Sequence, residues 1–483
     1  MINVSLENQE STFKSEEIFI SKTDKRGVIE YGNSVFTRVS GYAEDQLIGA
    51  PHKIIRHRDM PRSVFKLFWD TIQKGEPIIA YVKNRAIDGK YYWVLATCYP
   101  SSDNLGYLSI RIKPLTELKN AAENLYKQVI QIEQEKGMEE GIKYILGELK
   151  KLGFNSYEEF MIHSLYEELS ARQKAVRSNY TKKYNTQDQQ LSALVNTFTE
   201  MKTLSVNSIQ RFSQAVLPLK EYLKSKEEFE TGAAQIAQVC ERLEFLSVNM
   251  SISAHKLGKL GGTLSVVANS FQTTAQKIVK DFEDFQKKSV QIADRIQNIF
   301  LNLGCATVQN EMLGFSLGEI LEKLTTRVEG VANKPMSLEI EHSIKQTEEL
   351  IKNIEHYFKP VFKEAESFYG LINANHRNLV QLGDLVTQLD LIKTGGKLEG
   401  SRSNEIVQSF EPFIIEMNEF IEGVQTPVQK IMYLIKGLET AFADILAAGN
   451  HIEHASFELH FLLNNLKTAA EELFQTETKG DAA

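Results

Sequence analysis

The stretch "IIAYVKNRAIDGKYYWVLATCYP", residues 78–100, decides the fold of the first part of this chain. Two runs rich in aromatic and β-branched residues flank the pair Asp88-Gly89. An Asp-Gly pair between such runs is a strong signal for a β-hairpin. The stretch therefore predicts two long antiparallel strands joined by a tight turn.

Further strands are expected on both sides of this hairpin. Residues 16–33, "EEIFISKTDKRGVIEYGN", read as two strands around a turn, and residues 105–114, "LGYLSIRIKP", read as one more strand. Short helical segments lie between the hairpins, and Gly41 and Gly75 are natural helix ends. The predicted fold is a small α+β domain over residues 16–114, with a five-stranded antiparallel sheet and short helices, preceded by a flexible N-terminus at residues 1–15.

The chain changes character after Pro114, where the strand patterns stop. Apolar residues then recur at spacings of three and four, which is typical of a coiled-coil seam: Leu115, Leu118, Ala122, Leu125, Val129 and Ile132. The sequence therefore predicts linker helices over residues 115–182, with a coiled coil leaving the first domain.

The remaining sequence predicts an all-α helical bundle. Helical periodicity continues almost to Leu473, with a kink expected at Pro218. Gly-rich spots suggest two helical hairpins in series. We expect a hairpin over 183–335 with its tip near 256–262, a second over 336–475 with its turn near 395–404, and a disordered tail over 476–483.

Composition restricts the function classes. The formal net charge of −8 argues against a nucleic-acid partner, because phosphate binding needs a basic face. Three scattered cysteines fit a reducing compartment and form neither a disulfide framework nor a zinc motif: Cys98, Cys240 and Cys305. No apolar run approaches the ~20 residues of a membrane span, and the N-terminus lacks a signal-peptide pattern. The sequence therefore predicts a cytoplasmic protein.

The N-terminal sequence resembles a PAS sensory domain of the type found in bacterial aerotaxis receptors. The resemblance rests on four stretches in order: "VSGYAEDQLIGAPHKIIRHRDMP", "FKLFWDTIQKGEP", "VKNRAIDGKYYWV" and "GYLSIR". It implies a five-stranded sheet with helices cupped over one face. It also implies FAD in the cup, whose redox state reports on oxygen or electron transport.

Carried over residue by residue, the resemblance implies a flavin pocket formed by Arg56, His57, Trp69 and Asn84, with Asp59 nearby. An aromatic wall and a few polar groups suit the flavin ring, and Arg suits a diphosphate. Alternatives stay open: Trp69 is a core residue and the cup is filled by its own side chains, or a haem is bound with His57 as axial ligand.

Two positions depart from the PAS pattern of the aerotaxis receptors. Ile78 stands where that family usually has Trp, and Ala80 stands where it has Gly. A smaller wall residue could loosen a flavin or remodel the cup.

Residues 236–278 resemble a degenerate copy of the hairpin tip of chemoreceptor (methyl-accepting) signalling domains. In that family the tip binds a histidine kinase and its coupling protein. Here Glu241 replaces an aromatic residue used in docking, Lys256 replaces an apical Arg, and Lys259 replaces a tip Glu. These three are the candidate partner-binding residues, either in a divergent docking tip or in a tip kept for self-association, which would allow a homodimer through the helices.

A second stretch, residues 389–410, parallels this tip at a constant spacing of 146 residues. Leu389, Ile392, Leu398 and Arg402 fall opposite Leu243, Leu246, Ile252 and Lys256. If the parallel is real, two helical hairpins could form an intramolecular bundle in place of a receptor dimer.

No catalytic or nucleotide-binding motif is found in the sequence, so we expect no enzyme activity. His451, His454 and His460 cluster on a predicted helix, where a polar bundle face is favoured over a metal site. The sequence predicts a cytoplasmic signal-transduction protein that senses redox or oxygen state through a flavin and relays it to a partner by a shift between helix packings. The alternative is a scaffold protein whose PAS domain has no cofactor and only dimerises.

Overall fold

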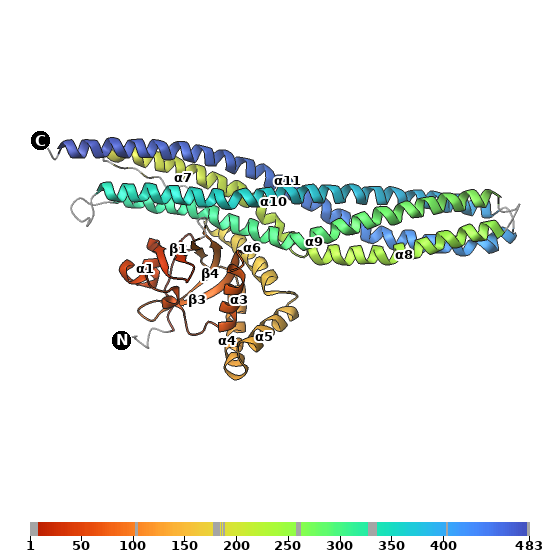
Figure 1. Ribbon diagram of the computed structural model, residues 1–483, viewed down its shortest axis with the longest axis horizontal. Coiled ribbons are helices and arrows are strands. Elements are labelled where there is room, and N and C mark those ends of the chain that lie inside the picture. Colours follow the sequence, from red (N-terminus) through yellow and green to blue (C-terminus); the bar gives the residue numbers. More distant parts are fainter. Residues whose placement is uncertain are drawn as a thin grey trace. The chain divides into compact units, whose positions relative to one another are not determined.

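The computed structural model describes residues 8–101, 105–176, 184, 186, 189–256, 262–326, 336–401 and 404–480. The N-terminal part contains a five-stranded sheet of order β2-β1-β5-β4-β3, in which all neighbouring strands are antiparallel (Figure 1). Its strands are β1 (Ile18–Asp24), β2 (Ile29–Gly32), β3 (Ile78–Arg85), β4 (Tyr91–Pro100) and β5 (Gly106–Ile112). The predicted fold class is confirmed.

The predicted hairpin at residues 78–100 is formed by β3 and β4. Gly89 adopts a φ of 100°, a left-handed conformation that favours glycine, and the backbone N–H of Ala86 donates to the carbonyl of Lys90 at 2.8 Å. The Asp88 carboxylate accepts a hydrogen bond from the Lys90 backbone N–H. This turn chemistry fixes the register, which pairs Asn84 with Tyr92 and Ala80 with Ala96.

Short helices connect β2 to β3. They are α1 (Ser34–Ser40), α2 (Glu44–Leu47), the 3-10 helix η2 (His52–Ile55) and α3 (Arg62–Ile72). Asn33 caps α1 by accepting from the backbone N–H of Phe36, and Gly41 ends it with a φ of 71°. The segment before β1 is also ordered where it is described, because Phe13 is buried against Phe19. The expected flexible N-terminus over residues 1–15 is corrected for residues 8–15.

The linker contains α4 (Leu118–Lys136), α5 (Met138–Lys151) and α6 (Tyr157–Val176). One face of α4 is buried: Ala122 and Val129 of the expected seam are at most 1% exposed. On the same helix the Tyr126 ring lies 6.3 Å from that of Trp93 in the sheet, and its hydroxyl donates to the carbonyl of Tyr81 at 3.1 Å. The predicted coiled coil is therefore wrong for this segment. A spacing of three and four residues identifies the buried face of a helix without identifying what covers it.

Long helices make up the rest of the described chain. They are α7 (Gln189–Val216), the 3-10 helix η4 (Leu217–Tyr222), α8 (Ser225–Lys256), α9 (Gly262–Thr325), α10 (Met336–Gly400) and α11 (Asn404–Gly480). In place of a kinked helix, α7 ends two residues before Pro218. Most of the expected tip near 256–262 lies outside the described residues, as does part of the expected turn near 395–404. The helix α11 extends past residue 475, so the expected disordered tail is corrected up to Gly480.

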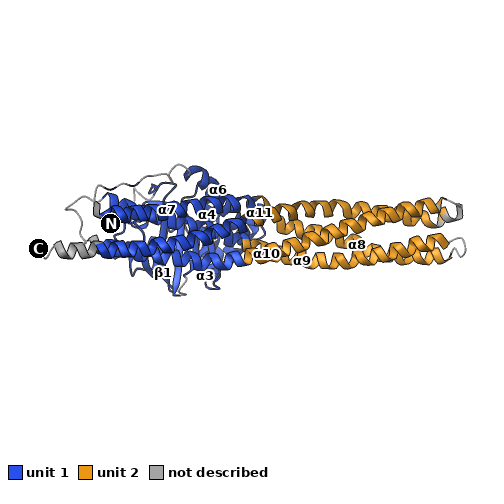
Figure 2. Cartoon of the chain, turned by 90° about the horizontal axis from the view of Figure 1, so that it is seen from above, with its two compact units in different colours: residues 1–220, 300–363, 445–483 blue, residues 221–299, 364–444 orange. Residues whose placement is uncertain are grey.

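The chain divides into two compact units, coloured in Figure 2. Unit 1 comprises residues 1–220, 300–363 and 445–483, and unit 2 comprises residues 221–299 and 364–444. Within the described residues, no helix combines the length and the apolar character needed to span a membrane.

Unit 2 is an antiparallel helical bundle. Its neighbouring helices are joined by contacts between Ser251 of α8 and Gln272 of α9, Arg295 of α9 and Glu364 of α10, Phe368 of α10 and Phe442 of α11, and Arg242 of α8 and Glu419 of α11. Second contacts give the direction: Gly232 of α8 lies against Ile431 of α11, Asn375 of α10 donates to Ser289 of α9, and Lys393 of α10 donates to Asn418 of α11. For these three helix pairs the residue numbers rise along one helix as they fall along the other, which is the pattern of antiparallel neighbours.

Candidate functional site

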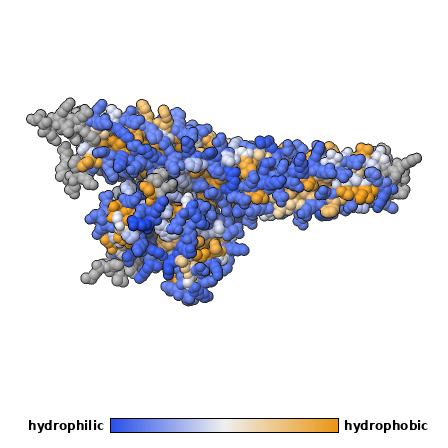
Figure 3. All heavy atoms as spheres, in the orientation of Figure 1, coloured by the Kyte–Doolittle hydropathy of each residue, from blue (hydrophilic) through white to orange (hydrophobic). Residues whose placement is uncertain are grey.

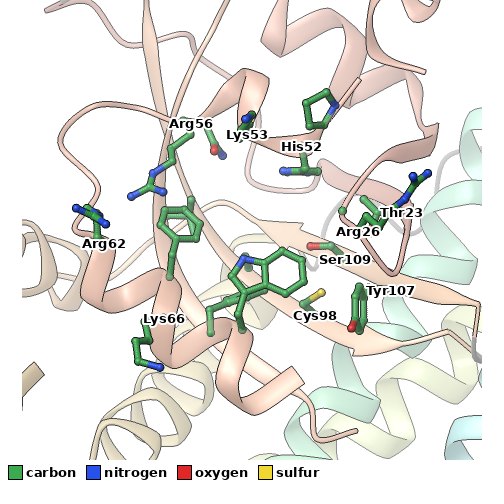
Figure 4. Close-up of a pocket in the computed structure, with 18 of the residues that line it drawn as sticks. Thr23, Arg26, His52, Lys53, Arg56, Arg62, Lys66, Cys98, Tyr107 and Ser109 are labelled. Atoms are coloured by element: carbon green, nitrogen blue, oxygen red, sulfur yellow. The ribbon is translucent and has the colours of Figure 1, made fainter. Parts of the chain in front are cut away.

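A cavity of about 460 Å³ lies in the N-terminal domain between the inner face of the sheet and α3 (Figure 4). Because side chains alternate along strands, every second residue of β3, β4 and β5 faces this space. These inward residues are Val82, Asn84, Ala96, Cys98, Tyr107, Ser109 and Arg111. A volume of this size is within the usual range for a small-molecule or cofactor site.

The wall opposite the sheet is largely aromatic. Phe65, Phe68 and Trp69 come from α3, and the Trp69 ring meets Tyr107 of β5 edge to face at 5.8 Å. The turn between β1 and β2 approaches this wall at Gly27, where a Cβ atom would lie 3.3 Å from the indole of Trp69. Gly27 also has a φ of 78°, so both its conformation and its space favour glycine.

Arg111 and His52 form the most unusual contact of the cavity. Arg111 is 4% exposed, its Nη2 donates to Ser21 Oγ at 2.9 Å, and the same nitrogen lies 2.6 Å from Nε2 of His52. Since a guanidinium only donates, His52 accepts through Nε2 and carries its proton on Nδ1. Burial and the Arg111 cation hold the pKa of His52 well below its usual value. Burial also lowers the pKa of Arg111.

Two buried polar atoms at this cavity have no hydrogen-bond partner. They are Nδ2 of Asn84 and Nη1 of Arg111, and both residues line the cavity. A buried donor without a partner is costly, by about 1–3 kcal/mol. These two donors therefore suit the acceptor atoms of a bound molecule.

Cationic side chains gather along the edge of the cavity (Figure 4). Arg26, Lys53, Arg56, Arg62 and Lys66 all contribute to its lining. A neighbouring hollow of about 690 Å³ shares three of these cations, Lys53, Arg56 and Arg62, and adds Arg58 and Arg85. This arrangement provides positive charge for an anionic group that extends out of the cavity.

Three of the predicted flavin-pocket residues line the cavity: Arg56, Trp69 and Asn84. The backbone of Arg56 forms an antiparallel bridge with that of Asn84, and its guanidinium lies 4.0 Å from the Phe65 ring centre. The sheet and the "RHRDMP" loop are thus joined at the cavity.

The other two predicted residues, His57 and Asp59, do not line the cavity. His57 is buried beside the neighbouring hollow, where its Nδ1 accepts from the Asp59 backbone N–H at 3.1 Å. The Asp59 carboxylate binds Lys83 at 2.7 Å. Burial, aided by Lys83, lowers the pKa of His57 to about 4. A haem ligated by His57 in the cavity does not fit this placement.

Sequence reasoning missed several cavity residues, above all His52, Cys98, Tyr107 and Arg111. A signal for Arg111 was present, because in the strand "GYLSIRI" it shares a face with Tyr107 and Ser109. An Arg inside a buried strand is unusual unless it has partners or a ligand. No local pattern pointed to His52.

The two positions that depart from the family pattern lie beside the cavity, outside its lining. Ile78 is buried in a cluster with Ile72 and Cys98, against which Trp69 packs, and Ala80 is buried opposite Ala96 in the sheet. Ile78 therefore belongs to the apolar cluster against which the aromatic wall packs.

The candidate partner-binding residues are placed in part. Glu241 and Lys256 are exposed on α8, whereas Lys259 lies outside the described residues. In the candidate metal cluster, His451 contacts Arg211, His454 faces Glu458, and His460 lies 2.9 Å from Glu355. No group of three or more His, Cys, Asp or Glu in the described part of the chain could hold a metal ion.

Comparison with known proteins supports the fold of this domain. Residues 29–109 match the family model described as the PAS fold. The N-terminal domain is a PAS domain. The chain is 37% identical over 147 residues to the aerotaxis receptor of Escherichia coli, which is 30% of this chain and 29% of the receptor. It is 27% identical over 96 residues to the biofilm dispersion protein BdlA of Pseudomonas aeruginosa, which is 20% of this chain and 23% of BdlA.

A solved structure similar to the PAS domain is the light state of the blue-light photoreceptor Aureochrome1 LOV. It is 22% identical, covers 23% of this chain and 90% of its own, and superimposes with a TM-score of 0.20. The matched region spans less than a third of the length of the aerotaxis receptor and of BdlA. The region shared with the aerotaxis receptor makes up 30% of the present chain.

Proposed function

We propose that this chain is a cytoplasmic aerotaxis- or chemotaxis-receptor-like signal transducer whose PAS domain binds a flavin, FAD, and senses redox or oxygen state. The observation that carries the proposal is the pair of unpartnered buried donors, on Asn84 and Arg111, inside an aromatic-walled cavity. A flavin ring has flat apolar faces and an edge rich in acceptor atoms, so its chemistry matches this lining.

The cations at the edge of the cavity support a dinucleotide. Arg56 and Arg62 line both the cavity and the neighbouring hollow, so a diphosphate leaving the cavity would meet guanidinium groups there. Such groups bind phosphate oxygens through paired hydrogen bonds. Trp69 would cover one face of the ring, and Asn84 would donate to its edge.

A flavin would supply reversible electron uptake, and the residues of the cavity would bias it. Arg111, held by Ser21 and His52, places a fixed positive charge at the cavity. A buried cation interacts more strongly with an electron-rich ligand than with a neutral one. We infer that Arg111 favours the reduced cofactor. A change of oxidation state would then change the electrostatic attraction between the cofactor and Arg111, and so the position of β5 and the neighbouring strands.

Three tyrosine hydroxyls offer a route from the sheet to the helices of unit 1. On the outer face of the sheet, the Tyr81 hydroxyl donates to Glu168 of α6, and the Tyr99 hydroxyl donates to the carbonyl of Cys305 in α9. The Tyr126 hydroxyl of α4 donates back to the Tyr81 carbonyl. Val82 and Asn84 of β3 line the cavity beside Tyr81, so a shift of β3 would reach α6 and α4, and a shift of β4 would reach α9 through Tyr99. We propose that two packings of these helices are the two signalling states.

The output would be a protein partner. A chemoreceptor-like bundle suggests a chemotaxis histidine kinase or its coupling protein, with Glu241, Lys256 and Lys259 in a divergent docking tip. The relatives are named as a receptor and a dispersion protein, and we propose no chemical turnover for this chain.

The test is the absorbance spectrum of the purified full chain after incubation with FAD and removal of free cofactor. We expect the visible flavin bands to remain at one cofactor per chain, and Trp69→Ala and Arg111→Met to lose most of them. Phe457→Ala, an exposed aromatic change in unit 1 outside the PAS domain, is the matched control and should keep them. A colourless, folded wild-type protein would overturn the flavin proposal and favour the scaffold alternative.

A further inference from the structure

The helix α8 carries an exposed stripe that its own bundle does not cover. The side chains of Phe245, Val248 and Ile252 are 75%, 44% and 49% exposed. Glu241 lies one turn before this apolar run and Lys256 lies one turn after it, and both are exposed. Residues spaced by three and four share one face of a helix, so these five residues form a single line, here called the α8 stripe.

The α8 stripe faces away from the interior of unit 2. The opposite side of α8 supplies the bundle core through Leu243, Leu246 and Met250, which are at most 4% exposed. Arg242 sits beside the stripe and is engaged by Glu419 of α11. Figure 3 shows apolar side chains among polar ones on the outer surface of this unit.

At the two ends of the stripe, neither Glu241 nor Lys256 lies within ion-pair distance of an opposite charge in the part of the chain that the structure describes. An exposed apolar line closed by two unpaired opposite charges is the pattern of a helix that packs against a second helix, with the charges setting partner and direction.

The order of residues in the stripe is self-complementary. If a second α8 lies antiparallel with its centre opposite residues 248 and 249, Glu241 faces Lys256 of the second copy and Phe245 faces Ile252 of the second copy. The remaining two contacts repeat these by symmetry, and the two Val248 side chains meet near the axis. A two-fold contact needs this property, because the same surface must match itself.

We propose that a second copy of this chain docks antiparallel on the α8 stripe. A parallel arrangement would place Glu241 against Glu241 and Lys256 against Lys256, and like charges in contact disfavour a complex. The proposal does not depend on the cofactor of the PAS domain. It concerns the same residues that a divergent docking tip would use, so self-association would compete with such a partner.

The matching helix of the second hairpin lacks the complete pattern. At a spacing of 146 residues, α10 presents the exposed side chains of Leu391 and Leu398 opposite Phe245 and Ile252. The position that matches Glu241 is Thr387, which carries no charge. The position that matches Val248 is Thr394, so the α10 surface is a control with two exposed leucines and without the acidic end or the central apolar residue.

The contact is short, so association should be weak. Residues 241–256 span about 24 Å of helix at 1.5 Å per residue. A contact of this length between two helices falls among small, reversible interfaces, whose occupancy depends on protein concentration and, through its charges, on salt.

The experiment is a charge exchange on the full chain, followed by sedimentation equilibrium at low salt over a wide range of protein concentration. Glu241→Lys leaves two positive ends and Lys256→Glu leaves two negative ends, so each variant alone should bind itself on the order of tenfold more weakly than the wild type. An equimolar mixture of the two variants should recover association, and so should the double variant. Both changed residues are exposed, which keeps folding intact, and circular dichroism verifies this.

Two hydrophobic variants complete the test. Phe245→Ser should weaken association, whereas Leu391→Ser on α10 should leave it at the wild-type level. The proposal is overturned if the wild type stays a 54.8 kDa monomer throughout, if the single charge variants associate as well as the wild type, or if mixing them restores nothing. If the Phe245→Ser variant associates as well as the wild type, the α8 stripe is excluded as the contact.

Discussion

The hydroxyl of Tyr81 lies 2.9 Å from a carboxylate oxygen of Glu168, which joins the outer face of the PAS sheet to α6. Glu168 is fully buried, and it also accepts from the backbone N–H of Leu115 at 2.5 Å and from the hydroxyl of Thr116 at 2.7 Å. One carboxylate therefore holds β3 and the segment that leaves the sheet for α4. Burial and the nearby carboxylate raise the pKa of Tyr81, so its hydroxyl remains a donor.

Removal of this carboxylate should destabilise unit 1. Glu168→Gln replaces an acceptor oxygen by an amide nitrogen that faces backbone and hydroxyl donors, and we expect a loss of about 2–3 kcal/mol in the free energy of unfolding. Tyr81→Phe removes one hydrogen bond and should cost about 1–2 kcal/mol. Thermal unfolding of the full chain measures both. Tyr144→Phe, which removes an exposed bond to Gln128, is the control and should stay within about 0.5 kcal/mol of the wild type. An unchanged Glu168→Gln transition would mean that this contact does not hold the linker.

Arg111 should tune a bound flavin as well as hold it. We expect Arg111→Met to weaken FAD binding by on the order of tenfold or more, because a charged hydrogen bond contributes about 1.5–3 kcal/mol. The cofactor that still binds should be harder to reduce, with a more negative midpoint potential, since the nearby cation is gone. A redox titration followed by absorbance measures the potential. Arg38→Met, at an exposed arginine of α1 that does not line the cavity, is the matched change and should leave the potential unaltered. Equal potentials in wild type and Arg111→Met would contradict the role of Arg111.

The stability of the PAS domain should fall below neutral pH. His57 has a folded pKa of about 4, lowered by burial and by Lys83, against an ordinary value of about 6.5. The unfolded chain therefore binds a proton that the folded chain rejects, and stability is complete above about pH 6.5 and lost as the pH falls towards 4. By about pH 5 the loss from His57 amounts to about 2 kcal/mol, and His52, whose pKa is also lowered, acts in the same direction.

The pH dependence is measured from melting temperatures between about pH 7.5 and about pH 5. His57→Gln should reduce the slope over this range, since a glutamine does not titrate, and the remaining slope is that of His52 and other groups. His454→Gln, at an exposed histidine of α11, should leave the slope of the wild type unchanged. A His57→Gln variant as acid-sensitive as the wild type would show that His57 is not protonated on unfolding.

Two glycines of unit 2 should respond oppositely to the same change. A Cβ atom at Gly232 of α8 would lie 2.5 Å from Cδ1 of the buried Ile431 in α11, so Gly232→Ala should destabilise the bundle by about 1–3 kcal/mol. Gly395 of α10 has open space around its Cα, and Gly395→Ala should stabilise the helix by about 0.5–1 kcal/mol. Chemical unfolding monitored by circular dichroism distinguishes these outcomes. A tolerated Gly232→Ala would indicate that the two helices are less closely packed than described.

The sequence was sufficient for the local architecture of the PAS domain. The Asp88-Gly89 turn, the period-two strands and the glycine that ends α1 depend on conformational preferences of neighbouring residues, which act over a few positions. Trp69 and Asn84, which the family resemblance named, line the cavity, and their role in binding a flavin stays a prediction.

The tertiary structure alone decided which groups meet. Arg111 and His52 are 59 positions apart, and their contact depends on η2 packing against β5. His57, one residue after Arg56, lies outside the cavity lining, and its ring accepts a hydrogen bond from the Asp59 backbone N–H. The buried face of α4 contacts its own sheet through Tyr126, whereas Phe245 and Ile252 of α8 stay exposed. Periodicity states which face of an element is apolar, and only the packing of distant segments determines what covers it or leaves it free.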